Sequence, residues 1–346
     1  MTRPLRVGVL TGSDRERHLL LDKTEELNIW GNNDAWRLLH ELRSEAIHWQ
    51  RRHLTPNYFR REVRWKLDKF DVLFSQISDP DQNPRVLAVA ERLLRDCGRP
   101  VINPPAAVAE ATRDGVARAL ADLPGVAMPR TLRLSGKNPQ HDLKRLAGED
   151  FRFPAILRPA GAHTGMGTRL CGSLAEVAAA MVGGKDHYLT EFVDFRSLDG
   201  VYRKFRFFAI GSALVLRHML SSEEWMIHAK ARQGLALGRP ALRAEEQGYF
   251  TDGIERHYPE AWRGLQRIRA RIGLDYFGID CHLARDGPVV VFEVNATMNF
   301  FPLTTESAFD FSKVCLPRAL AAMRTLLAEK TKVPAAAPAG RERPTG

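Results

Sequence analysis

The chain of 346 residues carries a formal net charge of +10, with 44% hydrophobic and 27% charged residues. These proportions are those of a globular protein with room for two or three hydrophobic cores, and they exclude a disordered or fibrous chain. No apolar run reaches the roughly 18 residues of a membrane span, and the N-terminus lacks a signal-peptide pattern, so we expect a cytoplasmic protein that does not contact the membrane.

The positive charge permits acidic partners but does not identify them. Much of it lies between Arg37 and Arg64, in what we expect to be arginine-rich helices, and the sequence contains no recognisable RNA- or DNA-binding motif. We therefore do not expect a nucleic-acid partner. The cysteines have no metal-ligand spacing, which favours reduced core thiols over a zinc site or a disulfide framework. They are Cys97, Cys171, Cys281 and Cys315.

The first 104 residues alternate strand and helix patterns. Strands are expected at 5–10 and 70–74, and a third one ends at the proline-rich stretch 100–104. Between them, apolar residues recur close to every 3.6 positions over Asn83–Asp96, which predicts a helix. Strand, helix, strand predicts a small parallel sheet with crossover helices over residues 1–104.

The region between Asp14 and Lys69 is polar and aromatic, and we expect it to be largely helical. Its tryptophans are consistent with a substrate pocket or with a packed core, and the sequence does not decide between them. They are Trp30, Trp36, Trp49 and Trp65.

A glycine-rich loop, Ala160–Thr168, joins strand patterns at 153–159 and 169–171, and Ser173–Glu176 then begins a helix with a capping-box pattern. The loop is neither a P-loop, which ends in Gly-Lys-Ser/Thr and opens a helix, nor a Rossmann turn. The residues alone leave two interpretations. The loop is either a tight hairpin without a ligand or a loop whose glycines let backbone N–H groups approach phosphate oxygens.

Further strands are expected at 187–194 and in a hairpin over 201–218 that turns at Gly211-Ser212. In the hairpin, alternation places Lys204 and Arg206 on one face. That face is either a solvated basic surface or part of an anion site.

The segment Glu224–Arg232 carries three cationic or titratable residues at spacing two, which a strand would direct to one side. They are His228, Lys230 and Arg232. We expect 234–253 to be a polar loop over the site, 259–272 an amphipathic helix and 311–329 a closing helix.

The C-terminal third contains a β-hairpin over 278–297, turning at Asp286-Gly287, because this dipeptide supplies the positive φ angles of a two-residue turn. Pairing Arg285 with Pro288 sets the register. One face then carries the apolar residues that we expect in the core: Ile279, Cys281, Leu283, Val290, Phe292 and Val294.

On the other face this register places Asp280 directly opposite Glu293, and strand alternation adds Asn295. Two carboxylates opposite one another are destabilising unless something neutralises them. Mg²⁺ takes such oxygen ligands together with phosphate oxygens, so a metal site is our interpretation. The alternative is an edge hairpin whose acids meet nearby arginines.

The sequence Glu293-Val294-Asn295, with an aspartate on the neighbouring strand and Met298–Pro302 after it, resembles the metal-binding end of the ATP-grasp superfamily. Within it the chain is most similar to the group of ribosomal-S6 glutamate ligase, glutathione synthetase and D-alanine–D-alanine ligase. The resemblance implies an α/β (α+β) ATP-grasp fold with a small N-terminal parallel-sheet lobe at 1–104, two ATP-clamping subdomains at 105–330 and a disordered tail at 331–346. It also implies ATP and Mg²⁺ or Mn²⁺ as cofactors.

The resemblance also implies residue roles. The glycine loop would be the phosphate lid, and Glu191, Phe192 and Val193 would pair with adenine. The implied nucleotide site comprises Arg158, Gly161, Gly165, Met166, Gly167, Thr168, Glu191, Phe192 and Val193. Arg206, Lys230 and Arg232 would stabilise charge during catalysis, and Asp280, Glu293 and Asn295 would bind the metal.

The sequence departs from the family at Gly115, where many members have a lysine that reaches the nucleotide phosphates. Arg118 or Arg113 is expected to replace it, because a guanidinium also binds phosphate, although with a different reach.

The function implied is an ATP-dependent carboxylate–amine ligase that forms an amide or peptide bond through an acyl phosphate and releases ADP and phosphate. The alternatives are a phosphotransferase of the same fold and a non-catalytic nucleotide-binding regulatory protein. Expected partners are small-molecule or peptide carboxylates and amines. A homo-oligomer is possible on this sequence, which does not specify the substrates.

Overall fold

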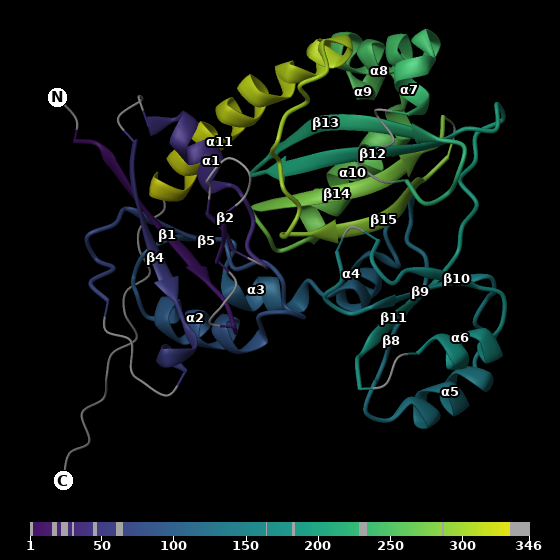
Figure 1. Cartoon of the computed structure of the whole chain (residues 1–346). Coiled ribbons are helices and arrows are strands. Elements are labelled where there is room, and N and C mark those ends of the chain that lie inside the picture. Colours follow the sequence, from purple (N-terminus) through teal and green to yellow (C-terminus); the bar gives the residue numbers. More distant parts are fainter. Residues whose placement is uncertain are drawn as a thin grey trace.

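The computed structural model describes residues 3–15, 19–21, 27–29, 31–43, 47–59, 65–163, 165–181, 184–227, 234–285 and 287–332. Within these ranges the chain is a mixed α/β structure with three sheets of four or five strands and one small two-stranded sheet (Figure 1). This confirms the predicted fold class. None of the described helices has the length and apolar character needed to cross a membrane.

The N-terminal sheet has the order β4-β1-β5-β6, and all its pairs are parallel, as predicted. Its strands are β1 (Leu5–Gly12), β4 (Ile47–Leu54), β5 (Val72–Ser75) and β6 (Val101–Ile102). The helices around it are α1 (Trp36–Glu41), α2 (Pro84–Arg95) and α3 (Pro105–Glu110), with a 3₁₀ turn η2 (Pro56–Tyr58). Helix α2 confirms the helix predicted over Asn83–Asp96.

The expectation of a largely helical region between residues 14 and 69 is wrong. Residues 47–54 form β4, which pairs with β1 along its whole length, and β2 (Leu19–Leu21) and β3 (Leu27–Ile29) form the two-stranded sheet. In β4, continuous pairing with a buried neighbour overrides the local propensity of its polar residues.

A second sheet, β10-β9-β11-β8, carries the glycine loop and is antiparallel throughout. Its strands are β8 (Thr131–Leu134), β9 (Ala155–Pro159), β10 (Arg169–Cys171) and β11 (His187–Glu191), and α5 (Pro139–Ala147) and α6 (Leu174–Ala180) pack with it. At the start of α6 the Ser173 hydroxyl accepts the backbone N–H of Glu176, as the capping-box pattern predicted.

The third sheet, β13-β12-β14-β15-β7, contains both predicted long hairpins. Its strands are β7 (Val126–Ala127), β12 (Tyr202–Ile210), β13 (Ala213–Ser222), β14 (Tyr276–Leu283) and β15 (Val289–Asn295). Around it lie α4 (Arg113–Leu120), α7 (Leu235–Gly238), α8 (Pro240–Asp252), α9 (Ile254–His257), α10 (Pro259–Arg271), η4 (Ser307–Val314) and α11 (Cys315–Lys332).

Two boundary expectations fail here. Residues 234–253 are not a loop, because Tyr249 and Phe250 of α8 are buried, and the Tyr249 ring contacts that of Phe205. Thr331 and Lys332, expected to belong to a disordered tail, are part of α11. Residues 333–346 lie outside the described chain.

The register of the β14–β15 hairpin is correct at the acidic residues and wrong at the turn. Asp280 pairs with Glu293 as predicted, whereas Leu283 pairs with Val289, so an irregularity between the two positions absorbs one residue. Phe292 is therefore not on the core face; its ring lies 4.4 Å from that of Phe195. Val289 and Val291 replace Val290 and Phe292 in the core.

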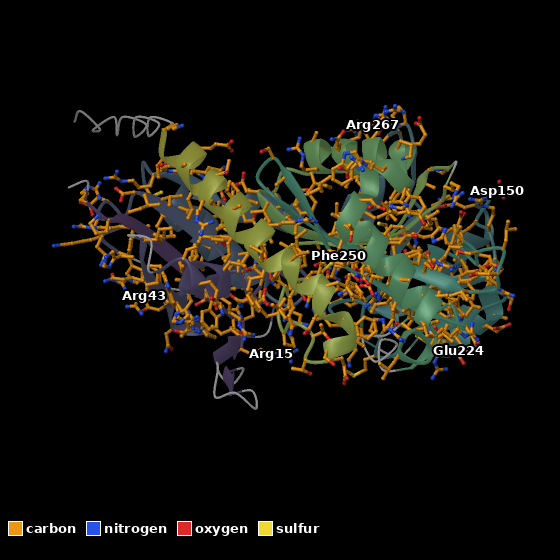
Figure 2. The ribbon with its side chains drawn as sticks, turned by 90° about the horizontal axis from the view of Figure 1, so that it is seen from above. Arg15, Arg43, Asp150, Glu224, Phe250 and Arg267 are labelled. Carbon is orange, nitrogen blue, oxygen red and sulfur yellow. The ribbon has the colours of Figure 1, made fainter. Side chains whose placement is uncertain are left out.

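One continuous hydrophobic core runs from the N-terminal sheet to the third sheet, whereas the glycine-loop sheet has a core of its own. Helix α11 contacts both β5 and β12–β13, and from above it runs from the N-terminal lobe towards Phe250 (Figure 2). The domain division that the sequence predicted at residue 104 therefore crosses a shared hydrophobic core. The domain boundary stays a prediction.

Asn103 joins these two parts at the end of β6. It has a positive φ of 54° and no solvent exposure, its Nδ2 donates to the Tyr276 carbonyl oxygen at 2.7 Å, and its Oδ1 accepts the N–H groups of Asp275 and Tyr276, each at 2.9 Å. This side chain fixes the start of β14, the strand that carries Asp280.

We expect Asn103→Ala to lower the free energy of unfolding by about 2–4 kcal/mol, because three buried hydrogen bonds are lost and alanine tolerates a positive φ poorly. Urea denaturation measures this change. Asn138→Ala is the control: Asn138 is exposed and makes no side-chain capping bond, so the change there should stay within about 0.5 kcal/mol. Equal effects of the two substitutions would contradict the role of Asn103.

Candidate functional site

The predicted metal ligands lie together on one face of the β14–β15 hairpin. Asp280 and Glu293 are paired residues, and the Asn295 side-chain amide donates to a Glu293 carboxylate oxygen. Asn295 Oδ1 accepts the backbone N–H groups of Thr297 and Met298, each at 2.9 Å, which fixes the orientation of its side chain. The hairpin thus brings two carboxylates and an amide to one place.

Asp280 is neutralised from the neighbouring strand. Arg206 pairs with it across β12–β14 and holds both carboxylate oxygens, with Nε–Oδ1 at 2.7 Å and Nη2–Oδ2 at 2.8 Å, and Lys204 Nζ lies 3.4 Å from Oδ2. Burial raises the pKa of Asp280, but Arg206 and Lys204 outweigh burial, so the net shift of the pKa is downward. The predicted catalytic Arg206 therefore lies within the site and is paired.

Glu293 is neutralised by cations from other segments. Arg113, in the first turn of α4, forms an ion pair with it. Burial raises the pKa of Glu293, but Arg113 and Arg158 outweigh burial and hold the pKa well below its usual range. Glu293 therefore stays ionised at neutral pH and available to a cation.

Arg158 lies at the base of the glycine loop. Its Nη2 donates to the Ala162 carbonyl oxygen at 2.6 Å, whereas its Nε is buried and has no partner. Burial, and secondly the neighbouring charge of Arg113, lower the pKa of Arg158 to about 10. A buried N–H donor without an acceptor is costly, so this guanidinium has capacity for an anion.

The glycine loop is bent by three glycines with positive φ angles, 69° at Gly161, 76° at Gly165 and 71° at Gly167. Met166 at its tip is 66% exposed, while Thr168 Oγ1 is buried without a partner. Thr164 lies outside the described residues. The loop thus combines an exposed tip with unfilled hydrogen-bonding capacity near its base.

The loop also contacts the N-terminal lobe. His163 Nε2 lies 2.7 Å from Asp79 Oδ2, and Gln82 Nε2 donates to the Gly161 carbonyl oxygen at 2.6 Å. The same N-terminal segment is joined to the residues that follow β15, because Thr297 Oγ1 donates to the Ser78 carbonyl oxygen at 2.9 Å. Residues 78–82 therefore link the loop to the end of the strand that carries Glu293. No sequence motif indicates this link.

The residues expected to pair with adenine contact a charged side chain, backbone carbonyl groups and an aromatic ring. The Glu191 carboxylate is bound by Arg152, with Nη2–Oε2 at 2.7 Å, and the backbone N–H groups of Glu191 and Phe192 donate to the carbonyl oxygens of Arg130 and Pro154. Phe192 also contacts the Trp225 ring edge-on at 5.5 Å. Val193 follows directly, at the end of this segment.

Several sequence expectations cannot be located. Lys230 and Arg232, predicted to be catalytic, lie outside the described residues, as does His228. Among the described residues, no group of three or more His, Cys, Asp and Glu side chains could hold a metal ion. A metal here would therefore rest on the carboxylate oxygens of Asp280 and Glu293, which are the hard donors that Mg²⁺ takes. The Asn295 amide oxygen would join them by giving up one of the two backbone N–H groups that it accepts.

The structure distinguishes the two arginines proposed to replace the family lysine. A Cβ on Gly115 would meet the Glu110 carbonyl oxygen, and its N–H caps the helix by donating to Thr112 Oγ1, so no lysine fits at this position. Arg118 is 70% exposed and pairs with Asp114. Arg113, 20% exposed and paired with Glu293, is the one that faces the site.

Asp34 was missed because no motif marks it; the only signal is its place in a polar run, Asn32-Asn33-Asp34, before a helix. It is 4% exposed and accepts the backbone N–H groups of Phe300 at 2.9 Å and Phe301 at 2.7 Å. Burial raises the pKa of Asp34 to about 6 in spite of these bonds. Asp34 anchors the segment that follows Asn295 to the N-terminal lobe.

The sequence matches no protein-family model and no curated protein sequence. Solved structures match its fold. VanG D-Ala:D-Ser ligase from Enterococcus faecalis gives a TM-score of 0.55 at 12% identity, covering 94% of this chain and 100% of that one. D-alanine–D-alanine ligase from Bacillus anthracis complexed with ATP gives 0.51 at 11% identity, covering 96% and 98%. Carboxyaminoimidazole ribonucleotide synthase from Aspergillus clavatus complexed with ATP gives 0.50 at 15%, covering 85% and 70%.

These matches confirm the ATP-grasp fold that the sequence predicted. Their names assign different substrates to the three proteins, so the fold does not specify a reaction.

The raised pKa of Asp34 makes the stability of the protein depend on pH, and this dependence tests whether the carboxyl group is buried. Because its pKa is raised in the folded state, its contribution to stability is complete below pH 4 and is lost as the pH rises through about 6. We expect the stability of the wild type relative to Asp34→Asn to fall by about 2 kcal/mol between pH 4 and pH 7. Urea denaturation of both proteins across this range measures it, and a difference that stays flat or rises would contradict the burial of a titrating carboxyl group here.

Proposed function

We propose that this chain is an ATP-dependent carboxylate–amine ligase that uses Mg²⁺ or Mn²⁺. The observation that carries the proposal is the set of three arginines, Arg113, Arg158 and Arg206, gathered around Asp280 and Glu293 below the glycine loop. Phosphate groups need cations of this kind, and a divalent metal needs the carboxylates. The ATP-grasp fold supports the same reading.

In this proposal Glu293, Asp280 and Asn295 would hold the metal. When bound, the metal would neutralise part of the negative charge of the phosphoryl group. Arg158 offers its unpaired Nε–H to a phosphate oxygen, and Arg113 lies beside it with its charge already oriented by Glu293. Positioning and charge stabilisation are the main sources of catalysis in phosphoryl transfer. Arg206 is oriented by both oxygens of Asp280, so it needs no reorganisation to act on developing charge.

The reaction that we infer begins with attack of a substrate carboxylate on the γ-phosphorus. This step gives an acyl phosphate and ADP, and an amine then displaces phosphate to form an amide. The glycine loop contacts the N-terminal lobe through His163 and Gln82. In this proposal it would cover the phosphates and limit hydrolysis of an acyl phosphate by water. Glu191, Phe192 and Val193 stay our proposed adenine segment, with Val193 next to the bonded amides.

A product assay separates the ligase from its two alternatives. Purified protein is incubated with ATP, Mg²⁺ and mixtures of amino acids, small peptides and organic acids, and ADP, phosphate and new amides are quantified. Equal release of ADP and phosphate that depends on both an acid and an amine supports the ligase. ADP without phosphate indicates a phosphotransferase, and ATP binding without ADP indicates a regulatory protein.

Glu293→Gln should abolish metal-dependent turnover, with a loss of roughly a hundredfold or more, because the neutral amide cannot supply the charge that binds the metal. Circular dichroism and thermal melting establish that the variant folds. Glu260→Gln, at an exposed residue paired with Arg263, is the matched control and should keep the wild-type rate. An unchanged rate in folded Glu293→Gln would refute the metal assignment.

Arg113→Gln should weaken ATP binding about tenfold, because one charge-assisted hydrogen bond to phosphate is lost. Arg118→Gln should leave the dissociation constant within about twofold, since that side chain is exposed and paired with Asp114. Equilibrium titration with ATP and Mg²⁺ measures both. The reverse order of effects would assign the phosphate contact to Arg118.

A further inference from the structure

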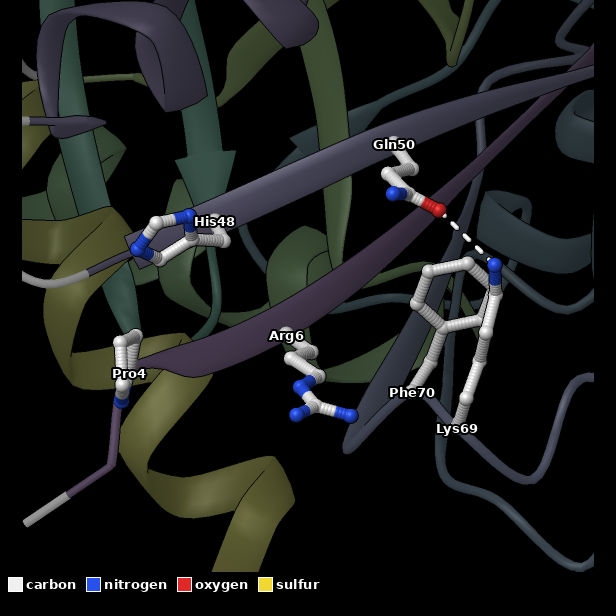
Figure 3. Close-up of a pocket in the computed structure, with 6 residues that line it drawn as sticks. All are labelled: Pro4, Arg6, His48, Gln50, Lys69 and Phe70. Atoms are coloured by element: carbon white, nitrogen blue, oxygen red, sulfur yellow. Dashed lines mark hydrogen bonds between the residues drawn. The ribbon is translucent and has the colours of Figure 1, made fainter.

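A concave site lies on the N-terminal lobe, away from the strands that carry the carboxylates of the third sheet. It has a volume of about 310 Å³ and is lined by Pro4, Arg6, His48, Gln50, Lys69 and Phe70 (Figure 3). We refer to it as the N-terminal basic pocket. Neither the comparisons nor the proposed ligase reaction assigns it a role.

The pairing of β1 with β4 builds one wall of this pocket. Arg6 pairs with His48 and Gly8 with Gln50, so alternate residues of both strands face the same side of the sheet. Gly8 leaves room for the floor, since a Cβ there would lie 2.8 Å from the Phe70 ring. Phe70 is 3% exposed and packs in the space that a larger residue at position 8 would fill. The pocket therefore has an apolar floor and a polar wall.

The polar wall offers hydrogen-bond donors and no carboxylate. The Gln50 side-chain oxygen already accepts from Lys69 Nζ at 2.9 Å, so the capacity that Gln50 has left is mainly its NH₂ group (Figure 3). Lys69 Nζ also lies 5.0 Å from the Phe70 ring centroid. Each of these contacts holds the ammonium group at the pocket.

Asp71, the residue after Phe70, already has charged and backbone partners. Both of its carboxylate oxygens are bound by Arg3, and one of them also accepts the backbone N–H of Arg6 at 2.8 Å. The Arg6 guanidinium itself has no ion-pair partner among the described residues. Its charge is therefore not balanced by an acid within the described chain.

We propose that the N-terminal basic pocket binds a small molecule carrying a dianionic phosphate group. Arg6 offers a planar pair of donors, Lys69 a point charge and Gln50 an amide, which together suit the several oxygens of one phosphate. The Phe70 floor accepts the organic part of such a ligand. The site is independent of the proposed ligase activity, because none of its residues belongs to the nucleotide site.

The proposal is tested by isothermal titration calorimetry with glycerol 3-phosphate and no nucleotide present. The wild type should bind saturably, and Arg6→Gln/Lys69→Gln should bind at least tenfold more weakly. Lys66→Gln/Arg92→Gln removes two exposed cations of the same lobe outside the pocket and should bind within twofold of the wild type. Arg158→Gln should also bind as the wild type does, which excludes the nucleotide site as the source of the signal.

The side chains of Arg6 and Lys69 are exposed, so the double variant should fold, and its melting curve verifies this. Titration with inorganic phosphate should give weaker saturable binding, and succinate should bind at least tenfold more weakly than glycerol 3-phosphate. The proposal is overturned by absence of saturable binding to the wild type, by equal binding to the double variant, by loss of binding in Arg158→Gln, or by equal affinity for succinate.

Discussion

The site depends on the neutralisation of two carboxylates that the β14–β15 hairpin places opposite each other. Asp280 and Glu293 are paired residues, and without counter-charges their repulsion would destabilise the hairpin. The chain supplies the cations from different places: Arg206 from the adjacent strand, and Arg113 from the start of a helix. Each carboxylate therefore fixes the position of an arginine, and the arginines keep both carboxylates ionised.

The two sheets that contribute to this site are built on different hydrophobic cores. The carboxylates lie on a sheet that shares one core with the N-terminal lobe, whereas Arg158 and the glycine loop belong to a sheet with its own core. The contacts of the loop itself with the N-terminal lobe are polar: His163 with Asp79, and Gln82 with the Gly161 carbonyl. Polar contacts of this kind separate at a lower cost than buried apolar area, so the glycine loop is less firmly held than the carboxylate strands.

The sequence predicted what depends on local alternation and turn chemistry, and it missed what depends on packing at a distance. The pairing of Asp280 with Glu293 followed from a turn residue and period-2 counting, although the assumed turn was one residue off and an irregularity at Phe292 compensated for the error. Strand β4 and helix α8 were missed because neighbouring elements, not their own residues, decide their conformation. The choice between Arg113 and Arg118 needed the structure, because both lie within three residues of Gly115 and only their partners, Glu293 and Asp114, distinguish them.

The two groups of cations in this protein differ in how their charge is balanced, and that difference predicts different behaviour. At the carboxylate site Arg113 and Arg206 each have an acid partner, so their positions are fixed but an anion must compete with that partner. At the N-terminal basic pocket Arg6 has no acid partner among the described residues, so its charge acts directly on an approaching anion. Exposed uncompensated charge is screened by salt within about 10 Å at 0.1 M ionic strength, whereas buried pairs are screened much less. Binding of an anion at the pocket should therefore weaken with ionic strength more steeply than the binding of ATP that we propose at the carboxylate site, where Arg113 and Arg206 are partly buried and paired.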